Sequence, residues 1–125
     1  MFLVLTMNSL MPSDGSASDN IIAAAKKEGK LMIYGKPATS ILNKFVQNFN
    51  QEYPFLKVDM YRSGTQKFLT RAFAEASAGK YIPDIFTTSI ENLQLLKSKD
   101  LLMKYISPES VNYPADVKEN QGFWT

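Results

Sequence analysis

Residues 31–62 read LMIYGKPATSILNKFVQNFNQEYPFLKVDMYR and decide the fold, because extended and helical patterns follow one another there. The unbroken apolar run 31–34 predicts a short strand covered on both faces, as in the centre of a sheet. Apolar and polar residues alternate over 56–62, which predicts a second strand with one solvent-exposed face, at a sheet edge. Between them, a helix ended by Pro54 is predicted from residues at helical spacing, namely Ile41, Leu42, Phe45, Val46, Phe49 and Tyr53.

Helical patterns also lie on both sides of this stretch. Before it, Ser18 or Asp19 is expected to cap a helix through 21–25 that Gly29 stops in a left-handed conformation. After the turn 63–65, a third helix is predicted from an apolar stripe that precedes Gly79; the stripe consists of Phe68, Leu69, Ala72, Phe73 and Ala76.

The last part of the chain predicts one more strand and one more helix. Pro83 precedes a short strand over 84–88, and Ser89 opens a helix with Ile90, Leu93 and Leu96 turned inward. Asp84 lies at the start of this strand and is interpreted as a turn or capping group. Residues 101–125 are turn-rich.

The order of elements defines a fold class. Helices and strands alternate, and the crossovers are long enough to join parallel strands by right-handed connections. We therefore expect an α/β fold with a doubly wound, mostly parallel sheet and flanking helices. In such sheets ligands bind beyond the carboxyl ends of the strands. Three segments lie there: 35–40, 62–65 and 87–91.

Composition restricts the function. The 125 residues fit one domain, and a net charge of +2 spread along the chain argues against nucleic acid as a partner. The chain has no cysteine and no histidine, so thiol nucleophiles and Ser–His pairs are excluded. Residues 1–17 are similar to a leader or a partial secretory signal peptide, although they lack a basic start, and residues 18–125 form the folded part.

Candidate ligand-binding residues lie in the first two loops. Thr39 and Ser40 can hold an anion at a helix start, or they can be ordinary N-caps, and Lys36 adds charge or is a solvated turn residue. Arg62 can bind a carboxylate or phosphate bidentately above a closely approaching backbone at Ser63 and Gly64. The alternative for Arg62 is a surface ion pair.

Two further candidates lie in the third loop. Thr88 and Ser89 form a hydroxyl pair at a helix start. Glu91 is the carboxylate near that end, and it can simply favour the helix dipole.

Several runs of sequence resemble a known family when taken in order. The runs AAAKKEGKLMIYG, FNQEYPFLKVDMYRSGTQKFLTRAFAEASAGKYIPDIF, LLMKYISPES and GFWT resemble the family 1 extracellular solute-binding proteins of ABC transporters, especially the ferric-iron-binding branch. The similarity covers about residues 20–125. It implies a lobe of the type II periplasmic binding fold, export to the periplasm or cell exterior, and delivery of a solute to a membrane permease. It also implies an N-terminal fragment that lacks the second lobe.

The resemblance departs from the family at the ligand. Members of the iron-binding branch ligate iron with a histidine in the first loop, an acidic residue after the third strand and tyrosines of the second lobe. This chain has no histidine, and Ser89 stands at the acidic position. No metal ligand and no cofactor is therefore predicted, and the expected solute is an anion, a carboxylated compound or a chelated metal.

Three hypotheses from different classes follow. The first is capture of a small anionic or metal-containing solute without catalysis. The second is a truncated, non-binding remnant or a small interaction module, and an unfinished sheet would then favour self-association. An α/β enzyme is the third and least favoured, because no close carboxylate pair flanks a predicted strand end.

Overall fold

The computed structural model describes residues 15–124. The chain divides into a first unit that ends at Thr87 and a second unit that begins at Thr88. Residues 1–14 of the predicted leader lie outside the described residues, and the helix α1 (Gly15–Glu28) begins ahead of the predicted caps Ser18 and Asp19. Those two cap predictions were therefore wrong. The predicted stop is confirmed, because Gly29 has a φ of 68° and its N–H bonds the carbonyl of Ala25 at 2.9 Å.

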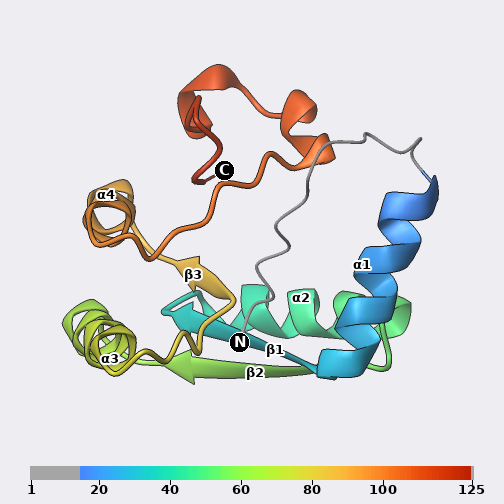
Figure 1. The fold of residues 1–125 in the computed structure, drawn as a ribbon, viewed down its shortest axis with the longest axis horizontal. Helices are drawn as coiled ribbons and strands as arrows, with labels where there is room; N and C mark the ends of the chain where they lie inside the picture. The colour runs from blue at the N-terminus through green and yellow to red at the C-terminus, as the bar shows by residue number, and fades with distance from the viewer. Residues whose placement is uncertain (1–14, 125) are drawn as a thin grey trace. The chain divides into compact units, whose positions relative to one another are not determined.

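The first unit contains a small parallel sheet flanked by helices (Figure 1). Its strands are β1 (Lys30–Gly35), β2 (Lys57–Arg62) and β3 (Ile85–Thr87), in the order β2-β1-β3. Both pairings of β1 are parallel. The expected α/β class, the central position of β1 and the edge position of β2 are confirmed. The third strand is shorter than the predicted 84–88, although Asp84 contacts β1 twice: its N–H donates to the carbonyl of Met32, and its carboxylate accepts the N–H of Met32, both at 2.8 Å.

The helix α2 (Thr39–Glu52) follows β1, and α3 (Thr65–Ser77) follows β2. Pro54 lies just beyond α2, as predicted. The predicted stripe of α3 is confirmed, since Phe68, Leu69 and Ala72 are buried. Gly79 ends this helix in a left-handed conformation, and the N–H of the following Lys80 bonds the carbonyl of Glu75 at 2.8 Å. The apolar face of α2 is packed less tightly, because none of its residues is fully buried.

Consecutive side chains of a strand point to opposite faces of the sheet. On one face, Tyr34 is completely buried and its ring lies 5.2 Å from the ring of Tyr61. The guanidinium of Arg71, in α3, lies 4.3 Å from the ring of Tyr61. The predicted wetted face of the second strand was therefore wrong for Tyr61, since α3 covers it.

The second unit contains α4 (Ile90–Ser98) and two short 3-10 helices, η1 (Pro108–Asn112) and η2 (Ala115–Val117). Leu96 is completely buried, as its predicted inward position requires, whereas Ile90 is 51% exposed and the prediction for it was wrong. The turn-rich character predicted after residue 101 is confirmed.

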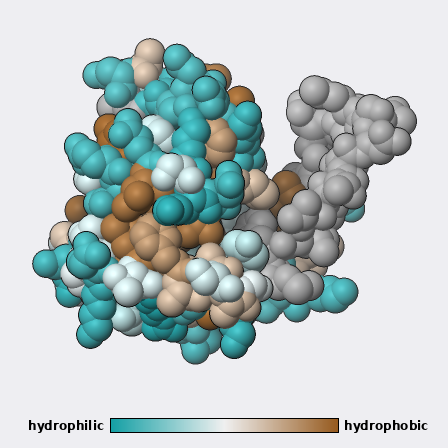
Figure 2. All heavy atoms as spheres, turned by 60° about the vertical axis from the view of Figure 1, so that its left-hand side comes forward, coloured by the Kyte–Doolittle hydropathy of each residue, from teal (hydrophilic) through white to brown (hydrophobic). Residues whose placement is uncertain are grey.

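Apolar side chains are exposed at many positions of the described chain. Figure 2 shows such side chains gathered among hydrophilic ones on one face. The most exposed large ones are Ile21, Ile41, Tyr81, Met103, Tyr105, Ile106, Val111 and Tyr113. Within the described residues β2 and β3 each pair on one side only. Self-association through the sheet stays a prediction.

Candidate functional site

The carboxyl ends of the three strands meet in one row of residues. Gly35 ends the central strand and pairs with Arg62 on one side and with Thr87 on the other. The loops that follow β1 and β2 therefore begin side by side. This is the edge at which parallel α/β sheets bind ligands.

Arg62 joins the first two loops. Its Nε donates to the carbonyl oxygen of Pro37 at 3.3 Å, and the N–H of Ser63 donates to the carbonyl of Gly35 at 3.4 Å. The hydroxyl of Ser63 is turned to the carbonyl of Gly64 at 3.3 Å. The structure thus brings together the candidates from 36–40 and 62–64. Arg62 is exposed and forms no ion pair among residues 15–124, so its alternative interpretation as a surface ion-pair partner has no support there.

Thr39 and Ser40 lie in the first turn of α2 and are exposed, but neither is the N-cap. The cap is Ala38, in an extended conformation with φ −60° and ψ 138°, and it has no side-chain hydrogen bond. The expectation of a hydroxyl cap was therefore wrong. Gly64 likewise begins α3 without a side-chain cap. The first N–H groups of both helices are consequently left without a capping side chain from the described residues.

The charges at this end of the first unit favour an anion. A helix N-terminus carries a partial positive charge, and neither α2 nor α3 has an acidic residue in its first turn. Lys36 is exposed at the start of the first loop, and Arg62 lies beside that loop. Two helix starts and two cations provide hydrogen-bond donors and positive charge without a competing carboxylate in either first turn.

The third loop differs because its hydroxyls are already bonded. The side-chain amide of Asn92 donates to Thr88 Oγ1 and to Ser89 Oγ, both at 3.0 Å. A hydrogen bond from Ser89 lowers the pKa of Glu91, so the Ser89 hydroxyl has a second partner. Thr88 and Ser89 open the second unit and its helix α4. Their assignment as ligand-binding residues stays a prediction.

Thr87 and Gly35 are features of this edge that sequence reasoning did not single out as ligand-binding residues. Gly35 has a φ of 154°, and a Cβ added there would collide with the Oγ1 and the carbonyl oxygen of Thr87. The Oγ1 of Thr87 is buried and has no hydrogen-bond partner among the described residues. The sequence placed both residues in segments expected at this edge, 35–40 and 87–91, but gave no sign of their close contact.

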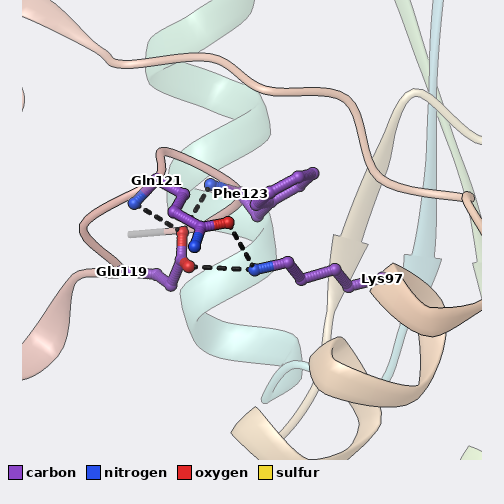
Figure 3. Close-up of polar contacts among 4 residues, drawn as sticks. All are labelled: Lys97, Glu119, Gln121 and Phe123. Carbon is purple, nitrogen blue, oxygen red and sulfur yellow. Dashed lines mark hydrogen bonds and ion pairs between the residues drawn. The ribbon is translucent and has the colours of Figure 1, made fainter.

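A second polar cluster lies within the second unit (Figure 3). Lys97 Nζ lies 3.0 Å from both Glu119 Oε1 and Gln121 Oε1, and 4.2 Å from the ring centre of Phe123. The other oxygen of Glu119 accepts the N–H groups of Gln121 and Phe123, at 2.9 and 3.2 Å. These contacts fasten residues 119–123 to α4. Both oxygens of Glu119 and the Oε1 of Gln121 have partners, so we interpret the cluster as structural.

Within 15–124, no group of three or more acidic, histidine or cysteine side chains is arranged to hold a metal ion. None of the helices described is long and apolar enough to cross a bilayer. No protein-family model matches the chain, and no curated protein matches it significantly.

Proposed function

We propose that this chain is the solute-binding component of an ABC-type importer and captures a small oxyanionic or metal-chelate solute without catalysis. The observation that carries the proposal is the pair of uncapped helix starts, of α2 and α3, beside Lys36 and Arg62. These groups are donors or cations, and they lie at the edge where parallel sheets bind ligands.

The ordered resemblance to family 1 solute-binding proteins supports the same proposal and adds its finer parts. On this basis the sheet is one lobe of the type II periplasmic binding fold. A partner lobe supplies the rest of the ligand's contacts, and a membrane permease receives the solute outside the cytoplasm. The strand order β2-β1-β3 with parallel pairing is compatible with such a lobe.

An interaction module is the second candidate, and one observation favours it. Large apolar side chains such as Ile41, 65% exposed, and Val111, 80% exposed, are accessible on a chain of this size. Exposed apolar surface of this kind often marks a protein partner. The two candidates differ in a simple measurement, because an interaction module gains no stability from a small oxyanion.

Thermal unfolding of the full chain with citrate, inorganic phosphate and ferric citrate tests the proposal. A ligand present at ten times its dissociation constant raises the free energy of unfolding by about 1.4 kcal/mol. Citrate and phosphate also stabilise proteins without binding them, because they are excluded from protein surfaces. The comparison must therefore be made between variants with equal net charge.

Lys36→Gln and Lys30→Gln form that matched pair. Both lysines are exposed and they lie at opposite ends of β1: Lys30 is its first residue, and Lys36 follows its last residue. We expect Lys36→Gln to lose most of the ligand-dependent shift and Lys30→Gln to keep it. Equal shifts in the two variants, or no shift with any of the three probes in the unmodified chain, would contradict the proposal.

A further inference from the structure

The hydroxyl of Thr87 is the buried side-chain oxygen that lacks a hydrogen-bond partner among the described residues. Leaving a buried hydroxyl unpaired costs about 1–3 kcal/mol. A buried hydroxyl without a partner calls for an explanation, and a functional role or a bound ion is among the usual ones. Its position therefore matters.

Thr87 belongs to the same row as Arg62, with Gly35 between them. Side chains paired across parallel strands point to the same face, and this face is opposite to that of Tyr34, Tyr61 and Phe86. The Nε of Arg62 reaches the carbonyl of Pro37, directly ahead of α2. Thr87 thus lies on the face of the sheet toward which Arg62 and the start of α2 are turned.

Gly35 is what allows the hydroxyl to lie in this row. Its missing side chain leaves the space over the centre of the row, and a Cβ there would collide with Thr87 Oγ1. The loop that follows Gly35 is joined to Arg62 by one bond of 3.3 Å, near the long end of the range for hydrogen bonds. A bound oxyanion competes well for that guanidinium, since charged hydrogen bonds are roughly twice as strong as neutral ones.

We propose that Thr87 is a ligand-binding residue whose hydroxyl donates to an oxygen of the anion that Arg62 and the start of α2 hold. The inference rests on the proposed function and narrows the class of ligand to oxyanions, that is, to a carboxylate or a phosphate. All the groups involved are donors: a guanidinium, backbone N–H groups and a hydroxyl. Because Arg62 and Thr87 flank Gly35 in the same row, one anion at this edge is within reach of both residues.

Two Thr→Val substitutions at neighbouring positions test this inference. Thr87→Val keeps the shape of the side chain and removes an unpartnered hydroxyl, so the melting temperature stays the same or rises. Thr88→Val removes a hydroxyl that accepts a bond from Asn92, so the melting temperature falls. With citrate as the probe, calorimetric titration should show about tenfold weaker binding for Thr87→Val. Thr87→Ser, which keeps the hydroxyl, should bind like the unmodified chain.

The outcomes separate the inference from the proposed function. If the unmodified chain binds none of citrate, phosphate and ferric citrate, both are wrong. If it binds citrate and Thr87→Val binds equally well, the inference alone is wrong. A melting temperature that falls for Thr87→Val as much as for Thr88→Val also overturns the inference, because the hydroxyl then has a partner within the fold.

Discussion

The hydroxyl of Tyr34 lies 2.9 Å from both carboxylate oxygens of Glu75, and this contact connects the central strand to α3. Tyr34 is completely buried, and the Nε of Arg71 bonds the same carboxylate at 2.7 Å. The carboxylate of Glu75 is therefore shared by two donors, one from the sheet and one from its own helix. The contact fixes the helix whose first turn forms part of the candidate site.

Replacement of Tyr34 by phenylalanine is expected to destabilise the chain by about 1–3 kcal/mol, because Glu75 then loses a donor in a half-buried position. Tyr81→Phe is the control, since that side chain is 61% exposed. Urea unfolding measures both. Equal midpoints for the two variants would show that the Tyr34–Glu75 contact contributes nothing to stability.

Alkaline pH gives a second measurement of this contact. Burial, followed by the bond to Glu75, raises the pKa of Tyr34 from 10.0 to about 12. The folded state keeps this proton where the unfolded state loses it, so the stability it contributes is complete below pH 10 and is lost up to about pH 12. Tyrosinate absorbance should show a late-ionising group among the six tyrosines, and Tyr34→Phe should abolish it.

Gly35→Ala is expected to cost about 3 kcal/mol of stability, because the substitution combines an unfavourable φ with a collision against Thr87. Gly79→Ala is the matched control. Its φ of 70° is also unfavourable for alanine, but no atom lies within 4 Å of the added Cβ, so we expect about 1–2 kcal/mol. Chemical denaturation compares the two, and an equal cost would show that the close approach to Thr87 is not tight.

Ala38→Ser is expected to stabilise α2 and weaken anion binding at once. A serine N-cap bonds an N–H of the first turn and contributes about 1 kcal/mol, but it also occupies a donor that the anion needs. Ala24→Ser makes the same chemical change in the middle of α1 and should do neither. Stability is read from thermal unfolding and affinity from citrate titration. A higher melting temperature with unchanged affinity would separate the helix start from the ligand site.

Acid should loosen the second unit through Glu119. Desolvation opposes ionisation, but the hydrogen bonds from Lys97, Phe123 and Gln121 outweigh it and lower the pKa of Glu119 below 4.5. The stability that this carboxylate contributes is therefore present above pH 4.5 and is lost as the pH falls through the lowered value. Trp124 lies 5.7 Å from Lys97 and reports the change by fluorescence.

Glu119→Gln should show at neutral pH the Trp124 fluorescence that the unmodified chain shows only in acid. Glu28 is exposed, so the fluorescence of Glu28→Gln should depend on pH as in the unmodified chain. A Trp124 signal that does not differ between these two variants would mean that Glu119 does not hold residues 119–123 on α4.

The sequence predicted the elements more accurately than their details. The apolar run 31–34 and the stripe on α3 identified a central strand and a packed helix, because burial on one or both faces requires these patterns. The cap of α2 was missed because a sequence pattern fixes a helix end only to within one or two residues, and the observed cap, Ala38, lies one residue before Thr39. The bounds of β3 were missed because Asp84 bonds Met32 partly through its carboxylate, which no periodicity records.

The position of the candidate site on the sheet could be predicted, but not which residues form it. Strand order and parallel pairing bring 36–40 and 62–64 together, and topology rules anticipate that arrangement. The binding of Thr88 and Ser89 by Asn92 depends on side-chain geometry across one helical turn, so the sequence did not reveal it. The buried state of Thr87 depends on its register with Gly35, which only the structure supplies.

An amide NMR titration of the full chain with citrate reports anion binding residue by residue. We expect saturable shifts at the amides of Thr39 and Ser40 and at the first turn of α3, together with a shift of the Arg62 side-chain signal. Lys36→Gln should reduce these shifts and Lys30→Gln should not. Shifts that never saturate, or that appear at scattered lysines away from the carboxyl ends of β1 and β2, would contradict an oxyanion site at this edge.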